Sequence, residues 1–247
     1  MLLLVSWTCG CSAPDTPHSS LGNYVDSHFS SHTWLHDTWP SYLESSNWIL
    51  PASLAVSALA VRPFDKDLQE SFDGQWGDRP EIGDAATGVL LLGMLGSTFL
   101  APRDHSAVDQ FWNSAESFAL AYGTASLTNV FVRRTRPIGN DHASFPSGHT
   151  AGAFTAATLI ERNLGIAYGI PAYGLATVTA FSRVEVGKHF PSDVLAGAAI
   201  GVLAVHLVDT LHFGTDSSAG ICGTMSSVQL IPGFDDDGVS LSLAIPF

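Results

Sequence analysis

Three short motifs between Asn129 and Asp193 bring together side chains that can bind a phosphate and break its ester. They are Arg136-Pro137, then Pro146-Ser147-Gly148-His149, and then Ser182-Arg183 followed by His189 and Asp193. Together they provide two guanidinium groups, a set of backbone amides, two imidazoles and one carboxylate. No other segment of the 247 residues carries a comparably specific pattern, so the functional interpretation rests on these motifs.

Arg136 closes a basic run, residues 133–136, in a chain with only ten Lys and Arg residues. A guanidinium group presents a planar fork of donors that matches two phosphate oxygens, and it stays charged at any working pH. Pro137 disfavours a helical conformation for the residue before it, so we expect Arg136 at a helix end. The alternative is a basic run that is merely solvated.

The second motif predicts an anion site at the start of a helix. Ser147 is suited to the N-cap position, and Gly148 lets the backbone approach a ligand closely. The first amides of such a helix have no partner within the helix, and its dipole favours an anion there. His149 lies in the predicted first turn, where it can donate a proton to a leaving alkoxide. Capping alone would also explain small residues at this place.

The third motif is the most specific of the three. Ser182 and Arg183 end an apolar segment, five residues follow, and His189 then precedes Asp193 by four positions. We expect Ser192 to be the N-cap of the next helix and the Asp193 carboxylate to reach the His189 ring. A carboxylate on one ring nitrogen fixes the tautomer and leaves the other nitrogen free as a nucleophile. A surface histidine beside an aspartate that the helix dipole favours is the alternative.

Taken together, the motifs resemble those of the type 2 phosphatidic acid phosphatase superfamily, which includes vanadium haloperoxidases and bacterial class A acid phosphatases. The family pattern is Lys-x6-Arg-Pro, Pro-Ser-Gly-His and Ser-Arg-x5-His-x3-Asp. The second and third elements match fully, whereas the first has Asn129 in place of its lysine. The resemblance covers residues 85–209, about half of the chain.

The resemblance implies a role for each matching residue. Arg136 and Arg183 would hold the phosphoryl oxygens together with Ser147 and the Gly148 amide. His189 would attack phosphorus to form a phosphohistidine, Asp193 would orient it, and His149 would protonate the leaving group and later activate water. No metal and no other cofactor is required, since arginine and amide donors can stabilise the charge on the transferred group.

Asn129 leaves the expected site one cation short. Arg133 lies four residues further along, on the same face of a continuing helix, and we expect it to take the missing lysine's place. The alternative is a solvated Arg133 in an enzyme that works with two arginines.

Composition limits the class of protein and of partner. Only 13% of residues are charged, 46% are hydrophobic, and the mean hydropathy is +0.22. The formal net charge of −13 argues against a nucleic-acid partner and gives no overall attraction for phosphate. The expected partner is therefore a phosphate-ester substrate, with lipids among the candidates. The oligomeric state stays open.

Long uncharged stretches predict an all-α fold, a bundle of about six helices. The stretches are rich in Ala, Gly and Leu, and they span residues 52–61, 85–101, 117–132, 163–182 and 194–208. Most are shorter than the roughly 20 residues that a membrane-spanning helix needs, so their lengths favour a buried bundle. The resemblance favours a membrane protein, because the family contains many, and we expect membrane association.

The chain is expected to divide into four parts. Residues 1–12 are typical of an export signal without its basic region, with Gly10-Cys11 similar to a lipoprotein cleavage site. Residues 13–46 form a polar linker and 47–215 the phosphatase helical domain. Residues 216–247 alternate with period two around Asp237-Gly238, which predicts a small C-terminal β-hairpin.

These observations predict a metal-independent phosphatase for phosphomonoesters or lipid (pyro)phosphates. It would reside in the bacterial cell envelope, facing the periplasm and either membrane-embedded or lipid-anchored. Two alternatives remain: a vanadium-dependent haloperoxidase on the same fold, and a catalytically weak phosphate-binding protein of the envelope. Asn129 counts against the haloperoxidase, because a missing cation weakens resting vanadate binding.

Overall fold

A computed structural model describes residues 48–75, 77, 79–100 and 107–213, together with the backbone of residues 229–235 and 238–244. The expected signal and linker, residues 1–46, lie outside these residues. Each helix begins and ends as follows: α4 Ile49–Val61, the 3₁₀ turn η2 Arg62–Phe64, α5 Asp65–Phe72, α6 Pro80–Leu100, α7 Ala107–Val132, α8 Gly148–Leu164, α9 Ile166–Glu185 and α10 Pro191–Phe213.

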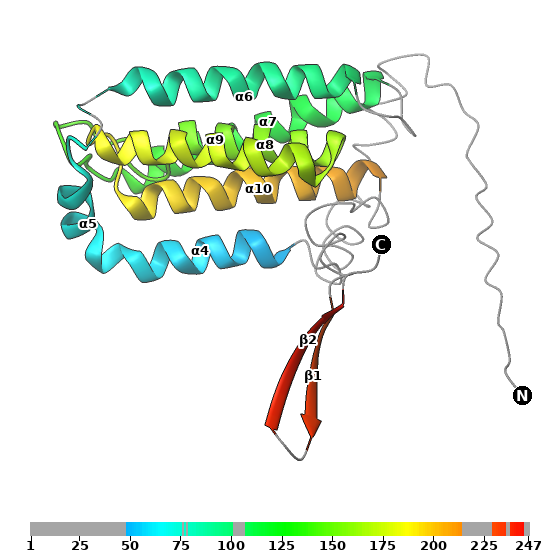
Figure 1. Cartoon of the computed structure of the whole chain (residues 1–247). Coiled ribbons are helices and arrows are strands. Elements are labelled where there is room, and N and C mark those ends of the chain that lie inside the picture. Colours follow the sequence, from blue (N-terminus) through cyan, green and yellow to red (C-terminus); the bar gives the residue numbers. More distant parts are fainter. Residues whose placement is uncertain are drawn as a thin grey trace, which may run out of the picture.

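The helices form a bundle, which confirms the predicted all-α class for this part of the chain. Among the described residues six helices are long, and the short α5 lies across one end of the bundle between α4 and α6 (Figure 1). Two strands, β1 (Gln229–Asp235) and β2 (Gly238–Ala244), pair antiparallel. The turn between them, residues 236–237, is not described, so the C-terminal hairpin stays a prediction.

Helix α8 is the centre of the bundle, because it packs against α6, α7, α9 and α10. Every residue from Thr150 to Glu161 is buried except Phe154. Its neighbours pack closely because the core is built largely from alanine, and the main apolar cluster includes Ala153, Ala156 and Ala157. A helix buried over such a length holds its first turn, the second motif, in a defined place.

Helices α8 and α10 cross with their backbones almost in contact. A β-carbon added to Gly197 would lie 2.5 Å from the carbonyl oxygen of Ser147, and one added to Gly201 would lie 2.4 Å from that of Ala151. Real β-carbons do not approach other atoms so closely, so only glycine fits at either place. The crossing therefore places the second motif, at the start of α8, directly against α10, the helix in which the third motif ends.

The outer surface of the bundle is strongly apolar. Leu92 and Leu100 on α6 and Phe131 on α7 are 72%, 76% and 81% exposed. Two helical segments, Pro80–Leu100 and Pro191–Leu211, are long and apolar enough to cross a membrane, although core helices of soluble proteins can meet the same criterion. Pro80–Leu100 extends beyond the uncharged stretch that the sequence indicated.

Two predicted helix ends are wrong. Helix α7 ends at Val132, four residues before Arg136, and Arg133 takes a positive φ of 49° that breaks the helix. Helix α10 begins at Pro191, so Ser192 lies inside its first turn and is not the N-cap. Proline is well suited to a first helical position because it has no amide hydrogen to leave unpaired.

We predict that Gly197→Ala lowers the free energy of unfolding by about 1–3 kcal/mol, because the added methyl group would push α10 away from Ser147. Gly174→Ala is the matched control, because a β-carbon at Gly174 meets nothing within 4 Å. Its higher helix propensity should instead stabilise the protein by about 0.5–1 kcal/mol. Thermal unfolding of the two variants measures both effects, and equal effects would contradict the close crossing.

Candidate functional site

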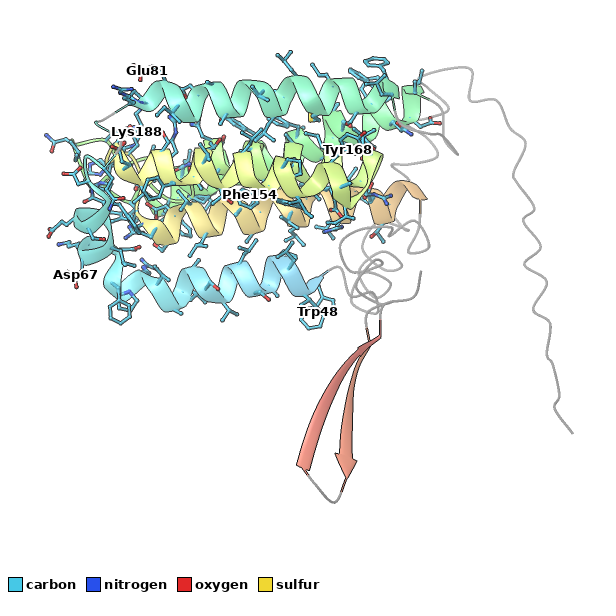
Figure 2. All side chains as sticks on the ribbon, viewed as in Figure 1. Trp48, Asp67, Glu81, Phe154, Tyr168 and Lys188 are labelled. Atoms are coloured by element: carbon cyan, nitrogen blue, oxygen red, sulfur yellow. The ribbon has the colours of Figure 1, made fainter. Side chains whose placement is uncertain are left out.

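The residues of all three motifs lie at one end of the bundle. That end carries α5, the loop after α7, the first turn of α8, the last turn of α9 and the start of α10. Figure 1 shows α5 at this end, and Figure 2 labels Asp67, Glu81 and Lys188 there, opposite Trp48. Chain segments more than 100 residues apart thus contribute to one region.

Two arginines place buried guanidinium nitrogens here. Arg183 is 1% exposed, and one of its terminal nitrogens donates to Asp84 at 2.6 Å and to the Pro80 carbonyl at 3.3 Å. Arg136 pairs with the exposed Asp141 at 3.2 Å. The Nε atoms of both arginines are buried and have no hydrogen-bond partner among the described residues. Buried donors of this kind are normally paired, so both are available to an anion.

The second motif begins a helix as expected. Ser147 is the N-cap of α8, and its Oγ accepts hydrogen bonds from the Thr150 amide and, at 3.0 Å, from the Thr150 hydroxyl, which confirms that prediction. Gly148 begins the helix, and the Tyr122 ring lies just under 4 Å from where a β-carbon on Gly148 would be. The amides of this first turn lie at the helix end where the dipole favours an anion.

His189 is buried, and its Nδ1 lies 2.6 Å from the backbone carbonyl oxygen of Ser144. A carbonyl oxygen can only accept, so Nδ1 carries the hydrogen and Nε2 keeps its lone pair. Burial lowers the pKa of His189 to about 4, the Ser144 carbonyl opposes that shift, and the charges of Arg136, His149 and Arg183 add to it. The ring is therefore neutral at pH 7, the form that a nucleophile needs.

Asp193 does not contact His189 directly, so the expected carboxylate–imidazole hydrogen bond is wrong. Its Oδ2 accepts from the Ser144 hydroxyl at 2.5 Å and from the Phe190 amide at 2.9 Å. The carboxylate is turned back toward the start of its own helix, where it caps the amide of Phe190. Asp193 instead holds Ser144, and the Ser144 carbonyl holds the imidazole.

A second ionic network behind His189 was not predicted from the sequence. Arg134 donates to Asp193 at 2.5 Å and to Asp65 at 2.7 Å, and its guanidinium carbon lies 4.2 Å from the centre of the Phe190 ring. Asp65, the first residue of α5, also accepts from the Ser192 amide at 2.9 Å. The sequence indicated no role for Arg134, and in the structure this residue joins α5 to α10.

His149 lies in the first turn of α8, as expected, and its side chain is exposed. Partial desolvation of its ring by the surrounding protein lowers its pKa below the usual value of 6.5, the charges of Arg183, Lys188 and Arg136 lower it further, and that of Asp84 raises it. These four charges come from different segments, so His149 lies in the region where all of them meet. A phosphate dianion bound there would favour its protonated form.

Asn129 lies against the second motif, whereas Arg133 does not occupy the place that the sequence suggested. The Asn129 amide nitrogen donates to the carbonyl oxygens of Ala125, at 3.1 Å, and of Pro146, at 3.2 Å. Arg133 follows the end of α7, so it does not continue the face that carries Asn129. Its side chain is exposed and has no hydrogen bond or ion pair with any described residue. The helical argument for Arg133 is therefore wrong.

The sequence pattern of the PAP2 superfamily matches residues 89–217, just over half of the chain and all three motifs. The chain belongs to the PAP2 superfamily. The match leaves out α4, α5 and the first turns of α6, and with them Asp65 and Asp84, the partners of Arg134 and Arg183.

Curated relatives of this PAP2 chain are bacterial phosphatases. A lipid A 1-phosphatase of Porphyromonas gingivalis is 39% identical over 159 residues, which are 62% of this chain and 36% of that protein. A decaprenylphosphoryl-5-phosphoribose phosphatase of Mycobacterium tuberculosis is 32% identical over 146 residues, or 54% and 76% of the two chains. The match thus spans about a third of the length of the first relative.

Solved structures also resemble parts of the chain. The crystal structure of Aquifex aeolicus LpxE has 20% sequence identity and a TM-score of 0.44, and the match covers 59% of this chain and 94% of that one. A transmembrane PAP2-type phosphatidylglycerolphosphate phosphatase from Bacillus subtilis has 23% identity and a TM-score of 0.43, over 66% and 92%.

We predict that Asp65→Asn destabilises the protein by about 3 kcal/mol, because it leaves Arg134 without one of its two buried carboxylates. The amide of the new side chain would also face donors at Ser192. Asp67→Asn, at an exposed position on the same helix (Figure 2), is the control and should change the free energy of unfolding by less than about 0.5 kcal/mol. Denaturant unfolding compares the two variants; similar losses would show that the network does not hold α5 on α10.

Proposed function

We propose that the chain is a metal-independent lipid phosphatase that works through a phosphohistidine intermediate. The observation that supports this best is the hydrogen bond from His189 Nδ1 to the Ser144 carbonyl. It leaves the Nε2 lone pair of a neutral imidazole free, in a region that also holds Arg136, His149 and Arg183. A neutral nucleophile among cations is the arrangement that attack on an anionic phosphate requires.

In the first step, His189 Nε2 attacks phosphorus and the bond from phosphorus to the leaving oxygen breaks. His149 gives its proton to that oxygen, so the alcohol leaves neutral. In the second step, His149 takes a proton from a water molecule whose oxygen attacks phosphorus, and the phosphorus–nitrogen bond breaks. Phosphate leaves, and both histidines return to their starting forms. Asp193 takes no proton and acts by holding Ser144.

Charge on the transferred group would be stabilised by the protein alone. The unpartnered Nε atoms of Arg136 and Arg183, the Ser147 hydroxyl and the Gly148 amide supply the donors. Phosphate release should therefore persist in the presence of a strong metal chelator. Loss of activity with chelator, and its return with one added metal, would contradict this part of the proposal.

A lipid leaving group is supported by a groove between α4 and α10. The groove has a volume of about 520 Å³, and Phe145 and Ser192 line it beside the residues that hold His189. Its walls continue along α4 through Ala55 to Trp48. A helix of this length gives the groove a wall roughly 20 Å long. The printed names of the relatives, which include lipid A phosphatases, also support a lipid substrate.

We further propose that the helical domain lies in a bacterial envelope membrane, with its catalytic end facing the periplasm. The apolar segments Pro80–Leu100 and Pro191–Leu211 would span the bilayer. Large exposed side chains such as Leu92 and Phe131 would face lipid, since apolar surface of this extent normally marks a membrane or protein contact.

We predict that His189→Ala abolishes turnover, whereas His149→Ala slows it according to the leaving group. Nothing replaces the nucleophile, but a general acid contributes about 10²–10⁴-fold and matters less when the leaving group is already a weak base. Phosphate release from an alkyl phosphate and from a nitrophenyl phosphate measures the difference. If His149→Ala lost the same factor on both substrates, it would not be the general acid.

We predict that Ala55→Trp reduces hydrolysis of a long-chain phosphatidate at least tenfold while hydrolysis of nitrophenyl phosphate stays unchanged. The indole would fill the groove without reaching the phosphate site. Ala60→Trp is the matched control, because Ala60 is exposed on the same helix and does not line the groove. A parallel loss on both substrates would mean that Ala55→Trp disturbs the fold and says nothing of lipid binding.

A further inference from the structure

We propose that Lys188 supplies the cation that the first motif lacks at Asn129, by contacting an oxygen of the substrate phosphate. This inference rests on the proposed phosphatase function and adds a residue to it. Lys188 is the last residue of the spacer between Arg183 and His189, a place where the family pattern specifies no residue. The spacer therefore gave no reason to select it from the sequence.

One compact turn holds Lys188 next to two residues of the site. The carbonyl oxygen of Arg183 accepts hydrogen bonds from the amides of both Lys188 and His189, each at 3.1 Å. The backbone of Lys188 is thus fixed between a phosphate-binding arginine and the nucleophile. The Lys188 side chain therefore starts from a backbone position between these two residues.

The turn is also attached to the loop that carries Arg136. The amide of Ile138 donates to the carbonyl oxygen of Gly187 at 3.0 Å, and Gly187 has a φ of 63°. A β-carbon on Gly187 would lie 2.3 Å from the end of the Ile138 side chain, so the two loops are in close contact. Lys188 therefore lies beside the loop of the first motif, the one that lacks its lysine.

The Lys188 side chain is half-buried and has no ion pair with any described residue. Its charge acts on His149, whose pKa it lowers. Arg133, the other candidate, is exposed beyond the end of α7 and is not among the charges that act on either histidine. An unpaired ammonium group close to the general acid is the free cation that a phosphate dianion requires.

The test compares Lys188→Gln with Lys66→Gln, which removes the only other lysine of the chain, from an exposed position on α5. We expect Lys188→Gln to lower kcat/KM for nitrophenyl phosphate about 10- to 100-fold. That is less than the roughly 10²–10³-fold measured for a buried donor, because Lys188 is half-exposed. Lys188→Arg should restore most of the activity, and Lys66→Gln should behave as the wild type does.

A pH profile shows whether the charge of Lys188 acts at the site, which a purely structural role would not produce. The charged groups around His149 are Arg183, Lys188 and Arg136, which lower its pKa, and Asp84, which raises it. Removing Lys188 raises that pKa, so His149 stays protonated to higher pH. The alkaline limb of kcat/KM should therefore shift to higher pH in Lys188→Gln and return in Lys188→Arg.

A double-mutant cycle links Lys188 to position 129. If one cation replaces the other, Asn129→Lys should raise kcat/KM more in the Lys188→Gln background than in the wild type.

His189→Ala is assayed in parallel. If it retains full activity, the proposed phosphatase function fails. If it is inactive while Lys188→Gln keeps wild-type activity and an unshifted pH profile, only the Lys188 inference is overturned. Loss of activity in Arg133→Gln, without loss in Lys188→Gln, would overturn it as well.

Discussion

The buried carboxylate of Asp193 is the constraint on which the rest of the candidate site depends. A charge withdrawn from water is tolerated only when it is paired and hydrogen-bonded. Asp193 is fully buried, and its partners are the Arg134 guanidinium, the Ser144 hydroxyl and the Phe190 amide. Those partners belong to the loop before α8 and to the start of α10. Satisfying one charge therefore fixes both loops, and with them the ring of His189.

The same end of the molecule is fixed a second time by backbone contact. The Ser147 amide donates to the carbonyl oxygen of Asp193 at 3.0 Å, and Gly197 lies one turn further along α10 against the Ser147 carbonyl. The N-cap of α8 and the start of α10 are thus held at a set distance. Because the proposed anion site and the proposed nucleophile, His189, belong to these two helix ends, their separation changes little unless the bundle itself rearranges.

Local signals in the sequence were sufficient to predict the helical class and most of the motif residues that meet at this end. The N-cap at Ser147 and the place of His149 could be predicted because both depend on neighbours within four residues. The hydrogen-bond partner of His189 could not be predicted in this way. A spacing of four suggests direct contact, but Asp193 turns back to cap its own helix, and the acceptor is a backbone carbonyl 45 residues away. Every residue has a backbone carbonyl, so the residue types in a sequence do not show which carbonyl accepts a given hydrogen bond.

Arg133 and Asp65 show two further features that could not be predicted from the sequence. No proline or glycine marks the end of α7 at Val132, and Arg133 adopts a positive φ that non-glycine residues seldom take. A helix extended to Pro137 was therefore the natural prediction, and it assigned Arg133 to the wrong place. Asp65 contacts Ser192, 127 residues away, and lies outside the segment that matches the family. Only the folded chain shows that α5 belongs to the end of the bundle that carries the candidate site.

The ion pairs of the two arginines that we propose to bind phosphate are asymmetric in a way that suits binding. Arg183 and Arg136 are 1% and 27% exposed, whereas their partners Asp84 and Asp141 are 56% and 57% exposed. An exposed carboxylate is solvated again when it swings into water, and the phosphate would replace it as the partner of the arginine. An incoming phosphate can therefore displace both carboxylates while the guanidinium groups stay in place. The phosphate could also accept hydrogen bonds from the Nε atoms of Arg136 and Arg183, which have no partner among the described residues. The two aspartates bind other nitrogens of these arginines. In a chain with a net charge of −13, attraction for an anionic substrate must come from such local pairs.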